Sequence, residues 1–159
     1  MALKEQLAEK YNCKSALKSP PHITLHMPFQ WRSDREDLLI EKLREFDFSG
    51  FSIDILLKGF GFFDPGVVFV DVVENENLTK LQSELIGYIR KSFNLFNANY
   101  KDKPFHPHVT IGFRDIKKSL FPEIKAEYML REFEGKFQTS GFHLLKHNGK
   151  TWDEFVLID

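Results

Sequence analysis

The sequence predicts an α+β fold in which antiparallel sheets are flanked by helices. Segments with apolar residues at helical spacing alternate with segments in which apolar residues recur at every second position. The predicted strands fall mainly into pairs that a short turn can join, as at Asp64-Pro65-Gly66 and His147-Asn148-Gly149-Lys150. Such pairs favour antiparallel sheets over a doubly wound parallel sheet. With 159 residues, 42% of them hydrophobic, the chain can form one domain of two interlocked lobes over residues 1–159.

The first half of the chain predicts two helices and three strands. Leu3, Leu7 and Tyr11 give the apolar stripe of the first helix. Ser33-Asp34-Arg35-Glu36 is typical of a capping box, which would start the second helix. The expected elements are a helix that ends before residue 18, a strand through residue 27, a helix over residues 33–49, and a hairpin of strands 51–61 and 67–73.

The second half predicts two further helices and three strands. Asn77 is expected to cap a long helix that runs to about Phe96. Its apolar stripe, which we interpret as core rather than a cofactor site, consists of Leu78, Leu81, Leu85, Ile89 and Phe93. After a polar loop over residues 97–104, the expected elements are a strand that begins at His108, a helix over about residues 117–133, and strands 136–146 and 152–158.

A short phrase, His-x-Thr-apolar, occurs twice, at His22-Ile23-Thr24-Leu25 and at His108-Val109-Thr110-Ile111, and each copy follows a proline. Side chains alternate between the faces of a strand, so the histidine and threonine of each copy share one face while the apolar residues point into a core. One copy alone would be structural, because threonine favours strands and a partly buried histidine is usually just hydrogen-bonded. Two matching copies indicate a functional site.

Two imidazoles and two hydroxyls together suit the cleavage of a phosphodiester. Near neutral pH, one imidazole can act as a general base and the other as a general acid. The hydroxyls can donate hydrogen bonds to an anionic group held between them. The sequence does not say which histidine is the acid and which is the base.

The two segments Pro21-His22-Ile23-Thr24-Leu25 and Pro107-His108-Val109-Thr110-Ile111 resemble the paired motifs of the 2H phosphoesterase superfamily, in its 2′-5′ RNA ligase-like branch. The resemblance covers nearly the whole chain. It implies a bilobal fold of two antiparallel sheets with flanking helices around a central cleft, which is lined by one His-x-Thr strand from each lobe. One departure is that Met1 opens directly on the first helix, whereas family members usually begin with an apolar strand.

The resemblance also implies the chemistry. Family members carry out metal-independent reactions on 2′,3′-cyclic phosphates or 2′-5′ linkages of RNA or nucleotides, without a cofactor. On this basis His22 and His108 are the expected catalytic residues, and Thr24 and Thr110 are the expected phosphate ligands.

Composition and charge limit the kinds of substrate and partner that we expect. A net charge of −1 gives no overall attraction for polyanions, so we expect a nucleotide or RNA end as substrate rather than an extended duplex. Cys13 is the only cysteine, which excludes an intramolecular disulfide and a cysteine-based zinc site. The chain begins on an amphipathic helix, and no apolar run approaches the roughly 18 residues that a membrane span needs. We therefore expect a cytoplasmic protein that does not enter membranes.

Two other classes of function stay open on the sequence alone. His106 and His108, with His22 or His26, could form a three-histidine zinc site of a hydrolase. That reading leaves the paired threonines unexplained and finds no convincing acidic partner near either motif. A non-catalytic nucleotide- or RNA-binding module is the other alternative, although both motifs are intact.

Several residues near the motifs carry weaker expectations. His26 and His106 are an even number of residues from the motif histidines, so on a strand their side chains would share the same face. Each could face the site or have a structural role. Three basic side chains flank the second motif and could attract phosphate: Lys101, Lys103 and Arg114. Four phenylalanines could stack on a base, although core packing is the simpler role for each: Phe29, Phe60, Phe105 and Phe113.

Overall fold

The computed structural model describes residues 1–49, 51–97 and 104–159. In this part of the chain the strands form two antiparallel sheets, one with the order β3-β2-β1-β4 and one of β5 and β6. The strands are β1 (Ile53–Phe63), β2 (Val67–Val72), β3 (His108–Gly112), β4 (Glu134–Thr139), β5 (Phe142–His147) and β6 (Trp152–Ile158). The helices are α1 (Ala2–Tyr11), α2 (Glu36–Arg44), α3 (Glu76–Phe93) and α4 (Phe121–Met129), with short 3₁₀ helices η1 (Ser15–Lys18) and η2 (Ser33–Arg35). The predicted α+β class with antiparallel sheets is confirmed.

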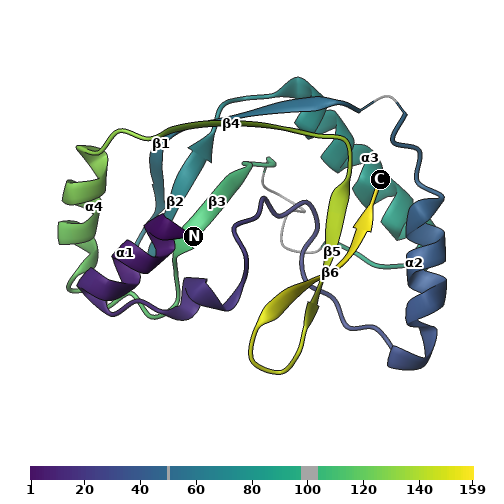
Figure 1. Cartoon of the computed structure of the whole chain (residues 1–159), viewed down its shortest axis with the longest axis horizontal. Helices are drawn as coiled ribbons and strands as arrows, with labels where there is room; N and C mark the ends of the chain where they lie inside the picture. Colours follow the sequence, from purple (N-terminus) through teal and green to yellow (C-terminus); the bar gives the residue numbers. More distant parts are fainter. Residues whose placement is uncertain (50, 98–103) are drawn as a thin grey trace.

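Helices gather at both ends of the molecule (Figure 1). α1 and α4 lie at one end, beside β1, β2 and β3, whereas α2 and α3 lie at the other end with the β5–β6 hairpin. Each end has a hydrophobic cluster, one around Leu7 and Ile124 and the other around Leu43 and Leu85. A further cluster, which includes Ile55, packs α3 against β1 and β2. No helix of the described segments combines the length and the apolar character needed to cross a bilayer.

The β1–β2 hairpin forms as predicted, with Gly61 directly opposite Phe69. A Cβ atom at Gly61 would overlap the Phe69 ring, so only glycine leaves room for this ring over the strand. Phe69 is almost completely buried. The hairpin therefore holds one aromatic ring in a fixed place beside β3.

The strand expected through Met27 is wrong. This segment makes one isolated antiparallel bridge, between Ile23 and Val109, and is otherwise irregular. Pro20, Pro21 and Pro28 have no backbone N–H, so the segment lacks donors that a longer ladder would need.

The boundaries of two helices, α3 and α2, also differ from the prediction. The cap of α3 is Asn75 rather than Asn77, because the Asn75 side chain accepts a hydrogen bond from the Leu78 backbone at 3.0 Å. The helix ends at Phe93, where Asn94 takes the left-handed conformation, and does not reach Phe96. The expected capping box does not form, since residues 33–35 make the 3₁₀ turn η2 without a side-chain cap, and α2 ends well before residue 49.

Two elements near the C-terminus differ from the prediction. The strand expected over residues 136–146 is divided into β4 and β5, which belong to different sheets. At the break, a Cβ atom on Gly141 would collide with the Ile158 carbonyl oxygen. The helix expected over residues 117–133 is confined to α4, because Pro122 is tolerated only in a first helical turn.

Candidate active site

The two His-x-Thr segments lie side by side. Ile23 and Val109 are partners in an antiparallel bridge, and Val109 also pairs with Val70 of β2. The first segment therefore lies along the outer edge of β3. Because the bridge is antiparallel, His22 lies across from Thr110, and Thr24 lies across from His108.

Each segment is anchored by its apolar residues to a different cluster. Ile23 and Leu25 pack with the cluster between α3 and β1, and Val109 and Ile111 pack with the cluster at the α1–α4 end. The four polar side chains of the two motifs are all half-buried, so each stays partly accessible from outside. They are His22, Thr24, His108 and Thr110.

The two imidazoles are held in the same way. Nδ1 of His22 lies 2.7 Å from the Pro20 carbonyl oxygen, and Nδ1 of His108 lies 2.7 Å from the His106 carbonyl oxygen. A carbonyl oxygen can only accept a hydrogen bond, so Nδ1 is the donor in both rings. Each neutral imidazole consequently carries its free lone pair on Nε2, where it can accept a proton.

Electrostatics distinguishes His108. Burial lowers the pKa of His108 below its usual value, and the nearby His106 and His22 rings act in the same direction. The hydrogen bond to the His106 carbonyl and the Asp71 carboxylate oppose this shift. The net direction favours a neutral His108 at neutral pH, and the influence of His22 reflects the closeness of the two motif histidines.

Aromatic rings and a carboxylate surround His108. The ring centroids of Phe69 and Phe63 lie 4.8 and 5.1 Å from that of His108. His106 Nε2 lies 3.1 Å from Asp71 Oδ1, and Asp71 is the β2 partner of His108 in the sheet register. The expectation that no convincing acidic partner stands near either motif is therefore wrong for the second motif. Asp71 interrupts the apolar run of residues 67–73, which is the sequence signal that could have revealed it.

The other residues singled out from the sequence have varied positions. Phe29, Phe60 and Phe105 pack against hydrophobic clusters, and Phe113 lies under the Arg114 guanidinium, 5.0 Å from its carbon to the ring centroid. His26 directs Nδ1 to the Met27 carbonyl at 2.7 Å. Lys101 and Lys103 lie outside the described residues.

The three-histidine arrangement is not assembled. Across residues 1–49, 51–97 and 104–159, no three histidine, cysteine, aspartate or glutamate side chains are placed to hold a metal ion. His106, which that alternative requires, instead faces Asp71.

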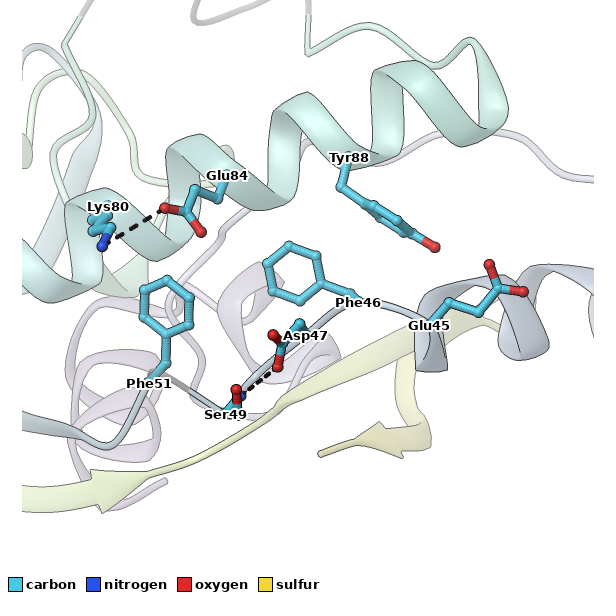
Figure 2. Close-up of a pocket in the computed structure, with 8 residues that line it drawn as sticks. All are labelled: Glu45, Phe46, Asp47, Ser49, Phe51, Lys80, Glu84 and Tyr88. Carbon is cyan, nitrogen blue, oxygen red and sulfur yellow. Dashed lines mark hydrogen bonds and ion pairs between the residues drawn. The ribbon is translucent and has the colours of Figure 1, made fainter.

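A separate hollow of about 560 Å³ lies between α3 and the segment that follows α2 (Figure 2). Three carboxylates line it, from Glu45, Asp47 and Glu84, and Lys80 supplies the one positive charge among its lining residues. That ammonium faces Glu84 at 3.9 Å. The excess of negative charge disfavours a phosphate here, so the motif histidines remain the better candidate for a phosphate site.

The fold and the paired motifs agree with the comparison to known families. The model of the 2′-5′ RNA ligase superfamily matches residues 2–151, so the chain belongs to this superfamily, the 2H phosphoesterases.

Relatives of similar sequence carry provisional phosphoesterase names. One, from Geobacillus sp. strain WCH70, is 27% identical over 139 residues, covering 86% of this chain and 75% of the relative. Another, from Geobacillus thermodenitrificans strain NG80-2, is 28% identical over 155 residues, covering 94% of this chain and 84% of the relative. The crystal structure of TT0787 from Thermus thermophilus superposes with a TM-score of 0.59 at 19% identity, covering 99% of this chain and 91% of that one. This likeness supports the fold, and the relatives' names support a phosphoesterase.

Proposed function

We propose that the protein is a metal-independent phosphodiesterase that opens 2′,3′-cyclic phosphates, with 2′-5′ linkages of RNA or nucleotides as the related substrate class. The observation that carries the proposal is the Ile23–Val109 bridge, because it brings both His-x-Thr segments to one place. Family membership supports the same class of reaction.

In the proposed reaction, His108 is the general base and His22 is the general acid. Nε2 of neutral His108 takes a proton from water, whose oxygen forms a new bond to phosphorus. Protonated His22 gives a proton to the ribose oxygen as its bond to phosphorus breaks. The product is a phosphomonoester with a free ribose hydroxyl, and the two histidines have exchanged protonation states.

Support for these roles comes from the lowered pKa of His108, which favours the unprotonated form that a base needs. The Nδ1 hydrogen bonds of both rings leave Nε2 as the atom that exchanges protons. Thr24 and Thr110 are assigned to the non-bridging phosphate oxygens, where a hydroxyl donor stabilises the negative charge of the transition state.

Alanine variants of the two histidines test the proposal. We expect His22→Ala and His108→Ala each to lower kcat for a 2′,3′-cyclic nucleotide by about 10²- to 10⁴-fold, which is the usual contribution of a general acid or base. Circular dichroism and thermal unfolding check that both variants fold.

His143→Ala is the matched control, because His143 lies on β5 beside Glu154 and outside the candidate site. It should retain wild-type activity. Full activity in either motif variant would show that the replaced histidine does not take part in the reaction. Nucleotide binding without turnover in the wild type would instead indicate a binding module.

A further inference from the structure

Lys4 is a buried cation that the proposed reaction does not use. It lies in the first turn of α1 and is only 2% exposed. Burial lowers its pKa to about 8, and a positive charge is also disfavoured near the N-terminus of a helix. Burying a lysine at this position reduces the stability of the fold. Its contacts therefore indicate which role offsets that cost.

The Lys4 ammonium donates to three backbone carbonyls of one short segment. Its Nζ atom lies 2.9 Å from the Ala16 oxygen, 2.9 Å from the Ser19 oxygen and 3.3 Å from the Pro20 oxygen. An ammonium group has three N–H donors, so these three acceptors satisfy it completely. Lys4 therefore fixes the segment that leads into the first motif.

The third of these carbonyls also holds His22. The Pro20 oxygen accepts from Nδ1 of His22 at 2.7 Å and from Nζ of Lys4 at 3.3 Å. The two side chains thus share a single acceptor atom, and the position of that atom determines how the His22 ring is turned. Within the described residues, the segment around His22 has the isolated bridge to Val109 as its one regular backbone pairing, so it depends more on such side-chain support than β3 does.

We propose that Lys4 is a positioning residue for His22: its ammonium fixes the Pro20 carbonyl, which in turn fixes the orientation and tautomer of the imidazole. The inference rests on the proposed function of His22. A displacement of about 1 Å at a reacting group can lower a rate by roughly 10²-fold, so loss of this support should be visible in catalysis.

The kinetic test compares Lys4→Met with the wild type. Methionine keeps most of the side-chain volume but removes the three donors. We expect kcat for a 2′,3′-cyclic nucleotide to fall by about 10- to 100-fold, while KM stays unchanged. Lys4→Arg, which retains a cation and several donors, should recover part of the loss. If Lys4→Met does not fold, Lys4→Gln takes its place; its amide keeps two N–H donors, so we expect a fall in kcat at the lower end of this range.

Lys10→Met is the matched control, because Lys10 lies on the same helix and pairs with Glu127 at the surface. It should leave kcat and KM unchanged. A folded Lys4→Met protein with wild-type kcat would overturn the proposal, and so would a rise in KM alone.

A second measurement does not need turnover. Nitrogen-15 NMR of labelled histidine reports the tautomer of the neutral His22 ring, with His22→Ala used to assign its signals. We expect a single tautomer protonated at Nδ1 in the wild type and a mixture in Lys4→Met. If the wild type is inactive but the tautomer changes in Lys4→Met, the proposed function fails and the positioning role stands. If the wild type is active and the tautomer does not change, the positioning role fails alone.

Discussion

At the scale of single residues, proline explains how each motif histidine is held. In both motifs the histidine follows a proline and bonds to the carbonyl of the residue before that proline. Proline fixes its own backbone angle φ and restricts the preceding residue to extended conformations. The carbonyl of Pro20 or of His106 is thereby directed at Nδ1 of the histidine two residues later. The repeated unit is better described as x-Pro-His-x-Thr, with the first residue supplying the acceptor.

The threonines are expected to act as hydrogen-bond donors and not as proton carriers. Thr24→Val and Thr110→Val keep the branched shape but remove the hydroxyl. Each should lose about 2.7–4 kcal/mol of transition-state stabilisation, or roughly 10²- to 10³-fold in kcat. The pH optimum should hardly move, because the histidines are unchanged. Steady-state kinetics on a cyclic nucleotide measures both quantities. A valine variant with full activity would show that its threonine merely favours extended backbone.

The pH dependence is expected to respond to Asp71. If neutral His108 is the base, the acid limb of the kcat/KM profile follows the pKa of His108, which burial places below its usual value. The negative charge of Asp71 raises this pKa, so Asp71→Asn should lower it further. The acid limb should therefore move to lower pH in the variant.

Asp54→Asn is the control variant for this experiment, because Asp54 is an exposed residue of β1. It should leave the pH profile of kcat/KM unchanged. An acid limb that moves to higher pH in Asp71→Asn would contradict the assignment of His108 as base.

The four candidate site residues could be singled out from the sequence because the same phrase occurs twice. Asp71 and Phe69 could not be assigned in this way, since their closeness to His108 depends on the pairing of β2 with β3 across a long stretch of chain. The role of Lys4 is even harder to predict from the sequence, because it follows from the packing of α1 against the segment before His22. Local patterns identify residues that bear chemistry, whereas their supports depend on tertiary contacts.

At the scale of secondary-structure elements, the β1–β2 hairpin supports the second motif. Gly61 leaves space for the Phe69 ring, and that ring packs beside His108. The hairpin itself could be predicted from its turn residues. The irregular backbone of the first motif could not be predicted. The alternation of its side chains resembles a strand, whereas its neighbouring prolines prevent a ladder of hydrogen bonds.

A methyl group at Gly61 should therefore disturb both stability and activity. We expect Gly61→Ala to lower the free energy of unfolding by about 1–3 kcal/mol, because the buried Phe69 ring must move. Phe69→Leu in the same chain should recover part of this loss by making room. Urea unfolding of the two single variants and the double variant gives the coupling free energy.

Gly66→Ala is the control, since nothing lies within 4 Å of a Cβ atom built there. Its free energy of unfolding should stay within about 1 kcal/mol of the wild-type value. Strictly additive effects of Gly61→Ala and Phe69→Leu would contradict the proposed contact.

At the scale of the whole molecule, the candidate site is formed by two segments that pack with different hydrophobic clusters. The first motif packs with the cluster between α3 and β1, and the second packs with the cluster at the α1–α4 end. The antiparallel α+β arrangement could be predicted from hairpin spacing. The pairing of Ile23 with Val109 could not be predicted, because no local sequence pattern relates residues so far apart in the chain.

The proposed function requires that the two motifs cleave a cyclic phosphate without a metal ion. The most direct measurement is hydrolysis of a panel of 2′,3′-cyclic nucleotides and cyclic-phosphate RNA ends by purified protein in excess EDTA, followed by phosphorus-31 NMR. We expect conversion of at least one substrate to a single phosphomonoester, at a rate that EDTA does not change. No conversion of any substrate, or activity that EDTA removes and zinc restores, would contradict it.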